Sequence, residues 1–356
     1  MGSESGIDLS RLVALADFEA IAAQRMDLAA YGYVAGGSWD EISLAEAVEA
    51  WHRYRLRPRM LRDVRSVDVS GSFFGRPSAL PVAVAPMAVQ GLAHPDGEIE
   101  MARGAVAAGI PYCLSTSASR TIEEVAAAVG AGEWWFQPYL VRDLDYTRSL
   151  VERAAAAGAS AIVLTVDLPV LGYRERDRRT GYTMPPMPNV EAAGGAARGR
   201  YGGIEGQRAI GLTWADIPAI RAWTGLPLAI KGLLRADDAL LAVDNGASAV
   251  VVSTHGARQL DRVVASADAL EEIALAVAGR AEVWVDGGIG RGLDILVARA
   301  LGATGVLIGR PFFYALAAAG SAGVERAAAI LREELELALP LLGVASLAEI
   351  ERGHVR

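Results

Sequence analysis

The chain has 356 residues, of which 52% are hydrophobic and 21% are charged, a composition typical of a globular protein. A net charge of −8 and a pI of about 5.2 argue against a nucleic-acid-binding surface. The single cysteine, Cys113, excludes an internal disulfide framework and a cysteine-cluster metal site, and we expect no metal. Because no run of about 18 apolar residues and no secretory signal occur, we expect a cytoplasmic protein that does not interact with a membrane.

Residues 1–80 are predicted to form an N-terminal helical extension, because helical patterns at 10–35 and 40–53 precede any strand-like run. Short apolar runs then recur along the chain, at 82–86, 112–115, 134–137, 161–167, 228–231, 249–253, 283–286 and 305–309. Each run is too short for a helix and rich in strand-forming residues. None alternates between apolar and polar residues, which indicates strands buried on both faces of a parallel sheet.

Alanine-rich stretches with helical character lie between these runs, and most of them end in glycine, a common helix stop. Eight strands that are each followed by a helix predict an α/β fold, a (β/α)8 TIM barrel of the usual length of about 250 residues. We assign the barrel to residues 82–320 and C-terminal helices to residues 321–356. A doubly wound sheet is disfavoured, because it would not need eight units and no G-x-G-x-x-G motif follows the first strand.

The connection between the fourth and fifth strands, from 167 to 228, is much longer than the others and rich in Gly, Pro and Ala. Long inserts without secondary structure are usually either lids or disordered segments. We interpret residues 175–212 as a lid loop over the active face.

Active sites of TIM barrels lie at the carboxyl ends of the strands, so the polar and small residues there are the candidate site residues. In chain order they are Pro86, Met87, Ala88, Ser115, Gln137, Tyr139, Thr165, Asp167, Arg174, Lys231, Ser253, His255, Arg258, Asp286, Gly287, Gly288, Gly309 and Arg310. The last two strands continue into VDGGIGRG and LIGRPFF, at the usual phosphate site of this fold. Tight turns alone would also explain these glycines. A buried lysine such as Lys231 is costly unless it faces an anion or a polarised group, which a flavin would supply.

His255 could be a structural histidine, but Asp167 on a nearby strand end makes an Asp–His pair possible. Such a pair orients the imidazole and suits a general base. Arg258 and Arg174 are natural partners for a substrate carboxylate, because guanidinium groups bind carboxylates bidentately. A surface salt bridge is the alternative for Arg174, which lies in the charged run YRERDRR.

The stretch STHGARQLD resembles the Ser-Asn-His-Gly-x-Arg-Gln-Leu-Asp signature of the FMN-dependent 2-hydroxy-acid oxidase and dehydrogenase family. The likeness covers residues 17 to 352, since YGYVAGG, LRPRML, LTVDLPVLGYRERD, VDGGIGRG and LIGRPFFY also fit in order. This resemblance implies one FMN-binding TIM-barrel domain over residues 1–356, and the family often forms homotetramers.

The resemblance also implies residue roles. His255 would be the catalytic base and Asp167 its partner, and Tyr139 would be a third catalytic residue that hydrogen-bonds the substrate hydroxyl or carboxylate. Tyr33, Arg174 and Arg258 would bind the substrate carboxylate. FMN would be held by Pro86, Met87, Ala88, Ser115, Gln137, Thr165, Lys231, Ser253, Asp286, Gly287, Gly288, Arg291, Gly309 and Arg310. The chain departs from the family at Thr254, where Asn is usual, and at Gly290, which replaces the first of two arginines in the phosphate loop.

The implied reaction is FMN-dependent oxidation of an (S)-2-hydroxy acid to the 2-keto acid, by hydride transfer or through a carbanion. Ala88 resembles the oxidase members, which predicts oxygen as acceptor and hydrogen peroxide as product. Small Ser117 and adaptable Met87 favour an aromatic acid, mandelate or 4-hydroxymandelate, as in the hydroxymandelate oxidases of antibiotic biosynthesis. A dehydrogenase, a small-substrate oxidase for lactate or glycolate, a non-redox FMN isomerase and a catalytically silent binding barrel are the alternatives.

Overall fold

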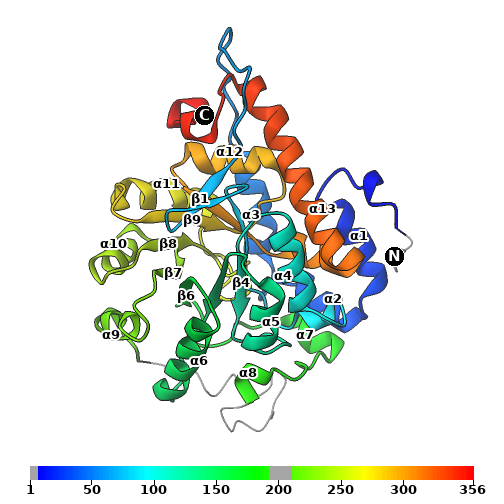
Figure 1. Cartoon of the computed structure of the whole chain (residues 1–356), viewed down its shortest axis with the longest axis vertical. Coiled ribbons are helices and arrows are strands. Elements are labelled where there is room, and N and C mark those ends of the chain that lie inside the picture. The colour runs from blue at the N-terminus through cyan, green and yellow to red at the C-terminus, as the bar shows by residue number, and fades with distance from the viewer. Residues whose placement is uncertain (1–6, 192–210) are drawn as a thin grey trace.

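The computed structural model describes residues 7–191 and 211–356, which fold around a closed barrel of parallel strands (Figure 1). The barrel strands are β3 (Val82–Val84), β4 (Tyr112–Ser115), β5 (Trp134–Gln137), β6 (Ala161–Thr165), β7 (Leu228–Leu233), β8 (Ala249–Val252), β9 (Glu282–Asp286) and β10 (Gly305–Ile308). Each strand pairs with the next one in the chain, and β10 closes the ring against β3. The predicted (β/α)8 barrel is confirmed.

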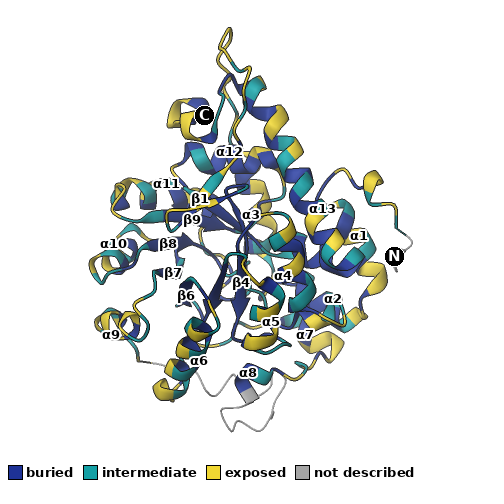
Figure 2. Cartoon of the chain, viewed as in Figure 1, coloured by how far each residue is buried: buried dark blue, intermediate teal, exposed yellow. Residues whose placement is uncertain are grey.

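Helices surround the barrel and expose their outer faces, while the strands are buried (Figure 2). They are α4 (Glu98–Ala107), α5 (Ile122–Val129), α6 (Leu144–Ala156), α7 (Glu175–Thr180), α8 (Pro188–Glu191), α9 (Ile217–Arg221), α10 (Ala236–Asp244), α11 (Ser266–Val277), α12 (Gly292–Ala300) and α13 (Arg310–Leu342). Short 3-10 helices lie at Leu9–Arg11, Gln90–Leu92, Trp214–Asp216, Leu347–Glu349 and Arg352–His354. Gly130 and Gly158 follow α5 and α6 with φ of 59° and 98°, as expected of helix-stopping glycines.

The N-terminal segment contributes α1 (Asp17–Arg25), α2 (Leu28–Ala35) and α3 (Ile42–His52). Figure 1 shows α1 beside α13, which is kinked at Ala319 and Gly320. The backbone N–H groups of Ile42 and Ser43 donate to the Asp261 carboxylate at 3.3 and 2.8 Å. An acidic side chain at a helix N-terminus satisfies donors that have no partner within the helix. The end of the HGARQLD motif therefore fastens α3 to the barrel.

A small antiparallel hairpin of β1 (Gly71–Phe73) and β2 (Arg76–Ser78) precedes the barrel. Phe73 and Phe74 meet Trp135 and Trp284 edge-on, and the two indoles stack with their centroids 5.1 Å apart. The barrel interior above them is filled by small side chains and by Cys113, which is fully buried. Aromatic packing therefore closes one end of the barrel.

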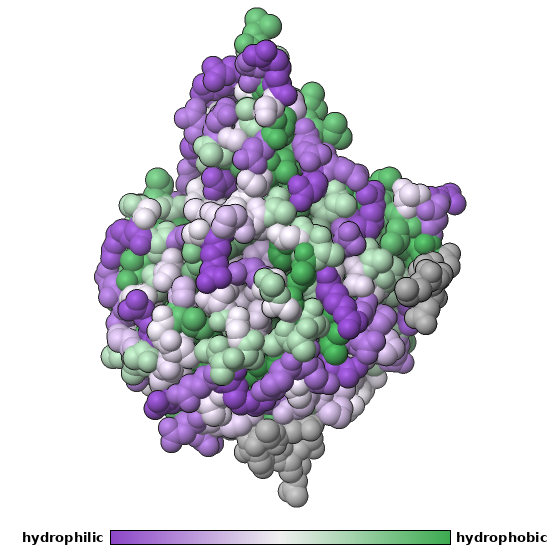
Figure 3. Space-filling model, in the orientation of Figure 1, coloured by the Kyte–Doolittle hydropathy of each residue, from purple (hydrophilic) through white to green (hydrophobic). Residues whose placement is uncertain are grey.

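The segment between α3 and β1 projects from the body, at the top of Figure 1, and includes the exposed side chains of Met60 and Leu61. Figure 3 shows apolar surface at the tip of this projection and mixed polar surface over the face below it. In residues 7–191 and 211–356, no helix combines the length and hydropathy needed to cross a membrane. Residues 192–210 of the predicted lid, 175–212, lie outside the described residues, and α7 and α8 belong to its described part.

Candidate active site

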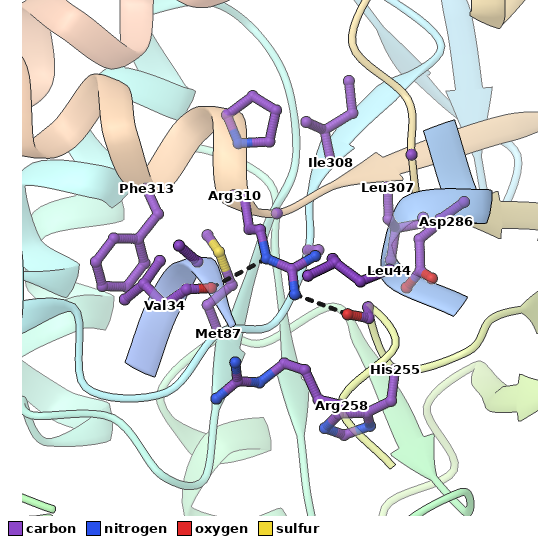
Figure 4. Close-up of a pocket in the computed structure, with 18 of the residues that line it drawn as sticks. Val34, Leu44, Met87, His255, Arg258, Asp286, Leu307, Ile308, Arg310 and Phe313 are labelled. Atoms are coloured by element: carbon purple, nitrogen blue, oxygen red, sulfur yellow. Dashed lines mark hydrogen bonds between the residues drawn. The ribbon is translucent and has the colours of Figure 1, made fainter. Parts of the chain in front are cut away.

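A cavity of about 750 Å³ opens at the carboxyl ends of the strands, where the sequence predicts the site. Each of the eight barrel strands, or the loop that follows it, contributes residues to its lining, and so do α2 and α3. Figure 4 shows His255, Arg258, Arg310 and Asp286 around this space. Its volume lies in the range of ligand and cofactor sites, roughly 300–1,000 Å³.

His255 lies at the cavity wall, and its Nδ1 atom is 2.7 Å from Oδ1 of Asp167, so the pair that the sequence left as a possibility is formed. Burial lowers the pKa of His255, and the Asp167 carboxylate only partly offsets this effect. Burial acts to raise the pKa of Asp167, but His255 and Lys231 outweigh it and hold that pKa below its usual value. The histidine is therefore neutral near pH 7 beside an ionised carboxylate, with Nε2 able to accept a proton.

The backbone around His255 adopts an unusual conformation, because His255, Gly256 and Ala257 have φ of 56°, 65° and 59°. Only glycine adopts this left-handed region freely. The His255 N–H donates to Ser253 Oγ at 3.0 Å, and the Ala257 N–H donates to Thr254 Oγ1 at 3.2 Å. Thr254 thus supports the turn that presents the histidine. Strained backbone of this kind clusters at active sites.

Two arginines lie on one side of the cavity with Tyr33 of α2. Arg258 lies over the Tyr33 ring at 4.5 Å, and its Nη1 atom donates to the carbonyls of Tyr33 and Gly36 at 2.5 and 2.9 Å. Its Nη2 atom is buried and has no hydrogen-bond partner among the described residues. The Arg174 side chain is buried, and its guanidinium is 5.9 Å from the Tyr33 ring. A buried guanidinium N–H without a partner suits an anionic ligand.

Lys231 of β7 forms a buried ion pair with Asp286 of β9, with 2.9 Å between Nζ and Oδ2. Nζ also donates to Ser253 Oγ at 2.7 Å. Burial acts to lower the pKa of Lys231, but Asp286 and Asp167 outweigh it, so the pKa is raised and the lysine stays charged. Oδ1 of Asp286 is buried and lacks a partner within the described part of the chain. It can accept a hydrogen bond from a bound polyol such as a ribityl chain.

The wall beside these charges is formed by the loops after β3, β4, β5 and β6. Pro86, Met87, Ala88, Ser117, Gln137, Tyr139 and Thr165 all line the cavity. The Tyr139 ring lies 6.5 Å from the His255 ring, centroid to centroid. Ser115 donates to Gln137 Oε1 at 3.0 Å, and Gln137 Nε2 donates to the Pro138 carbonyl at 2.8 Å, which fixes the amide. A flat ring system fits against such a wall of small and neutral polar groups.

The cavity is also lined by Gly287, Gly288, Gly309, Arg291 and Arg310. Gly288 has φ of 76°, and a β-carbon there would collide with the Ala47 carbonyl of α3. The Arg310 guanidinium donates to the carbonyls of Val34, Gly36 and Gly256, at 2.7–3.0 Å. Figure 4 draws its bond to the Val34 carbonyl as a dashed line. Burial lowers the pKa of Arg310 to about 10, and Arg258 adds to the effect, so an anion here would be stabilised.

Arg291 differs from Arg310 in its environment. Its Nη1 atom is 2.6 Å from Oε1 of Glu334, and half of its side chain is exposed. The N–H groups of Gly290 and Arg291 donate to Asp294 at 2.9 Å. Gly290 stands where the family that the chain resembles often has the first of two arginines, so this position supplies no cation. Arg310 is partly buried and Arg291 is half exposed, so Arg310 is the more enclosed of these two cations.

The structure brings most of the predicted site residues to one cavity. Asp167, Ser115 and Ser253 lie behind the wall and contact His255, Gln137 and Lys231. The apolar side chains of Leu168, Leu171 and Met184 also line the cavity and were not predicted from the sequence. They lie beyond the strand ends in segments without periodicity, so only their proximity to Asp167 and Arg174 in sequence could have suggested them.

The lining fits a flavin nucleotide, because it combines small and neutral polar groups, a buried acceptor without a partner on Asp286, and glycines beside the cationic Arg310. Comparisons with known proteins agree with this fit. The FMN-dependent dehydrogenase family model matches residues 22–356. The chain is 44% identical to L-lactate oxidase of Nostoc sp. (strain PCC 7120 / SAG 25.82 / UTEX 2576), over 96% of this chain and 98% of that protein. It is also 44% identical to 4-hydroxymandelate oxidase of Amycolatopsis orientalis, over 96% and 97%.

A solved structure of mandelate oxidase with (S)-4-hydroxymandelic acid superimposes with a TM-score of 0.91 at 44% identity, covering 97% of this chain and 98% of the other. The family match, these relatives and the shared barrel agree over nearly the whole chain. The chain therefore belongs to the FMN-dependent dehydrogenase family and is an FMN-dependent oxidoreductase.

Proposed function

We propose that this protein oxidises an (S)-2-hydroxy acid, preferably an aromatic one such as mandelate or 4-hydroxymandelate, to the 2-keto acid. The observation that carries the proposal is the neutral His255 held by Asp167 in the same cavity as the buried, unpartnered Nη2 of Arg258. A base and a carboxylate-binding cation in one enclosed site match a substrate that carries a hydroxyl beside a carboxylate.

In this proposal, Nε2 of His255 accepts the proton of the substrate while Asp167 stabilises the imidazolium. Arg258, Arg174, Tyr33 and Tyr139 hold the carboxylate and the hydroxyl. Bound FMN supplies the two-electron acceptor for the substrate carbon. Lys231 places a positive charge at the wall, where it would favour the reduced, anionic form of the ring.

The remaining predicted cofactor contacts follow from their places around the cavity. Pro86, Met87, Ala88, Gln137 and Thr165 would line the ring, with Ser115 and Ser253 behind them. Asp286 would bind the ribityl chain, and Gly287, Gly288, Gly309, Arg291 and Arg310 would surround the phosphate.

The aromatic preference is supported by the apolar part of the wall. Met87, Leu168, Leu171 and Met184 line the cavity together with the small Ser117. A phenyl ring would bury its apolar surface against them, at about 25 cal/mol per Å². Mandelate oxidase and 4-hydroxymandelate oxidase are relatives of this chain, but so are L-lactate oxidase and, at 42% identity, glycolate oxidase of Spinacia oleracea. A small-substrate oxidase is therefore the second candidate.

We also propose that oxygen reoxidises the cofactor and yields hydrogen peroxide. The support is Ala88 at the cavity wall and the oxidase names of the relatives. The homotetramer, the cytoplasmic location and the connection to antibiotic biosynthesis stay predictions; light scattering would test the tetramer.

Anaerobic mixing of the purified flavoprotein with a panel of hydroxy acids tests the proposal. The panel contains glycolate, lactate, mandelate and 4-hydroxymandelate, with peroxide detection in a parallel aerobic assay. We expect flavin bleaching with the aromatic acids at the highest kcat/KM. Absence of bleaching with every 2-hydroxy acid would refute the proposed reaction.

A second experiment replaces the proposed base and tests its role directly. His255→Asn should retain bound FMN, because the imidazole is assigned to the substrate proton and not to the cofactor. The rate of flavin bleaching should fall by about 10²–10⁴-fold. Bleaching at the wild-type rate would show that His255 is not the base.

A further inference from the structure

The segment after β6 carries two groups of the proposed reaction without any regular structure to hold them. Asp167 and Arg174 lie at its two ends, and residues 168–174 contain neither helix nor strand. Their separation nevertheless has to be kept, because Asp167 orients His255 while Arg174 lies beside Tyr33. Something outside the segment must therefore fix it.

The Gln259 side chain spans this segment from the loop after β8. Its Nε2 atom donates to the carbonyls of Asp167 and Val170, at 3.2 and 2.8 Å. Its Oε1 atom accepts from the N–H of Gly172 at 3.3 Å and from Nη2 of Arg174 at 3.5 Å. The amide thereby uses both of its donors and both acceptor positions. Gln259 is 8% exposed and is absent from the cavity wall.

Close packing reinforces these bonds. A β-carbon on Gly172 would lie 2.5 Å from the Arg258 carbonyl and 2.6 Å from the Gln259 carbonyl, so glycine permits the approach of the two loops. Nε of Arg174 donates to the Arg258 carbonyl at 3.3 Å. The loops after β6 and β8 are thus joined at the level of the two arginines, with the Gln259 amide in the middle.

We infer that Gln259 is a positioning residue that holds Arg174 at the substrate carboxylate and in register with the Asp167–His255 pair. The inference rests on the proposed function, because it assigns Arg174 to a carboxylate. Gln259 acts only through other residues, so its loss leaves the base and the cofactor contacts chemically intact. What is lost is the fixed place of Arg174, because Asp167 lies two residues after β6 and keeps its 2.7 Å contact with His255. A misplacement of about 1 Å at such a group can cost roughly a hundredfold in rate.

A merely structural glutamine would lower activity toward every substrate alike. A glutamine that acts through Arg174 affects only substrates that present a carboxylate. Mandelate and mandelamide differ in this group alone, so their kcat/KM ratio reports on the cation. Binding of benzoate, followed through the flavin absorbance spectrum, reports on the same cation without turnover.

The test uses Gln259→Met in the flavin-loaded enzyme, with Leu260→Ala as the control on the neighbouring, 65% exposed residue. Methionine keeps the length of the side chain and removes all four hydrogen bonds. We expect kcat/KM for mandelate to fall by roughly 10–100-fold, mostly through KM, and benzoate affinity to fall in parallel. Mandelamide turnover and FMN content should stay within about threefold, and Leu260→Ala should match the wild type for both substrates.

Equal losses for mandelate and mandelamide, or unchanged benzoate affinity, would overturn the inference. If Gln259→Met does not fold, Gln259→Asn, whose amide is one methylene shorter, gives the same acid-to-amide readout. The proposed function fails separately: no bleaching of the wild-type flavin by any hydroxy acid refutes the reaction, while the benzoate titration still tests Gln259.

Discussion

The two ends of the barrel differ in whether their buried polar atoms are hydrogen-bonded. At the amino ends of the strands, the Trp135 and Trp284 indoles stack, and each Nε1 donates to a glutamate, Glu133 or Glu282, at 3.1 and 2.9 Å. At the carboxyl ends, Asp167 Oδ2, Arg258 Nη2 and Asp286 Oδ1 are buried without a partner in the described residues. Unmade hydrogen bonds each cost about 1–3 kcal/mol in a protein interior.

The same eight strands therefore serve stability at one end of the barrel and ligand binding at the other. Satisfied aromatic packing stabilises the closed end, and polar atoms left without protein partners are available to ligands at the open end. Stability and chemistry should therefore respond to different substitutions, which can be tested at each end.

The largest effect is expected at the open end, from Asp167→Asn. The amide keeps the shape but removes the charge that stabilises the His255 imidazolium, so bleaching by mandelate should slow by about a thousandfold. Burial already lowers the pKa of His255, and Asp167 is the group that raises it. Its loss lowers this pKa further, so the acid limb of the kcat/KM profile should move to lower pH. A shift to higher pH would contradict the arrangement.

At the closed end, Trp284→Ala should remove stability and leave the chemistry unchanged. Truncation of a fully buried tryptophan typically costs about 3–5 kcal/mol. Urea unfolding should show a lower midpoint, while turnover per bound flavin stays within about twofold of the wild type at a temperature where the variant is folded. Leu275→Ala, at a side chain 74% exposed, is the control and should shift stability by less than about 0.5 kcal/mol. A loss of turnover per flavin without a loss of stability would break the division between the two ends.

The smallest effects should distinguish Arg310 from Arg291, the two arginines that we propose at the FMN phosphate. Arg310→Ala should weaken FMN binding by roughly 10–100-fold, since a hydrogen bond to a charged group contributes about 1.5–3 kcal/mol. Arg291→Ala should cost only a fewfold, because Arg291 is half exposed and already paired with Glu334. Fluorescence titration of each deflavinated variant with FMN gives its Kd for comparison with the wild type. Riboflavin, which lacks the phosphate, should bind both variants alike, and a larger loss for Arg291→Ala would reverse the ranking.

The barrel was predictable from the sequence because buried parallel strands leave uninterrupted apolar runs. The runs at 112–115 and 134–137 match β4 and β5, and the others differ by two residues or fewer at an end. The hairpin of β1 and β2 was not predicted. Its three-residue strands carry no periodicity, and their place depends on Phe73 meeting two tryptophans that are distant in sequence.

The candidate site was predictable where strand ends supply the residues, and less so where loops do. His255, Lys231 and Asp286 follow from the rule that TIM-barrel sites lie at the carboxyl ends of strands. Gln259 and Leu171 do not, because their roles depend on how two loops pack against each other. The left-handed backbone of His255 was not predicted either, since positive φ is uncommon for any residue other than glycine, histidine included.

Cys113 has a consequence for an enzyme that we propose releases hydrogen peroxide. Peroxide oxidises thiolates, and burial raises the pKa of Cys113 far above its usual value, so this thiol stays protonated and inaccessible. Peroxide formed in the cavity would instead meet the thioethers of Met87 and Met184, which line it, and oxidise them to sulfoxides. Oxidation of the substrate pocket would then limit the number of turnovers that each enzyme molecule completes, while the barrel core stays chemically unmodified.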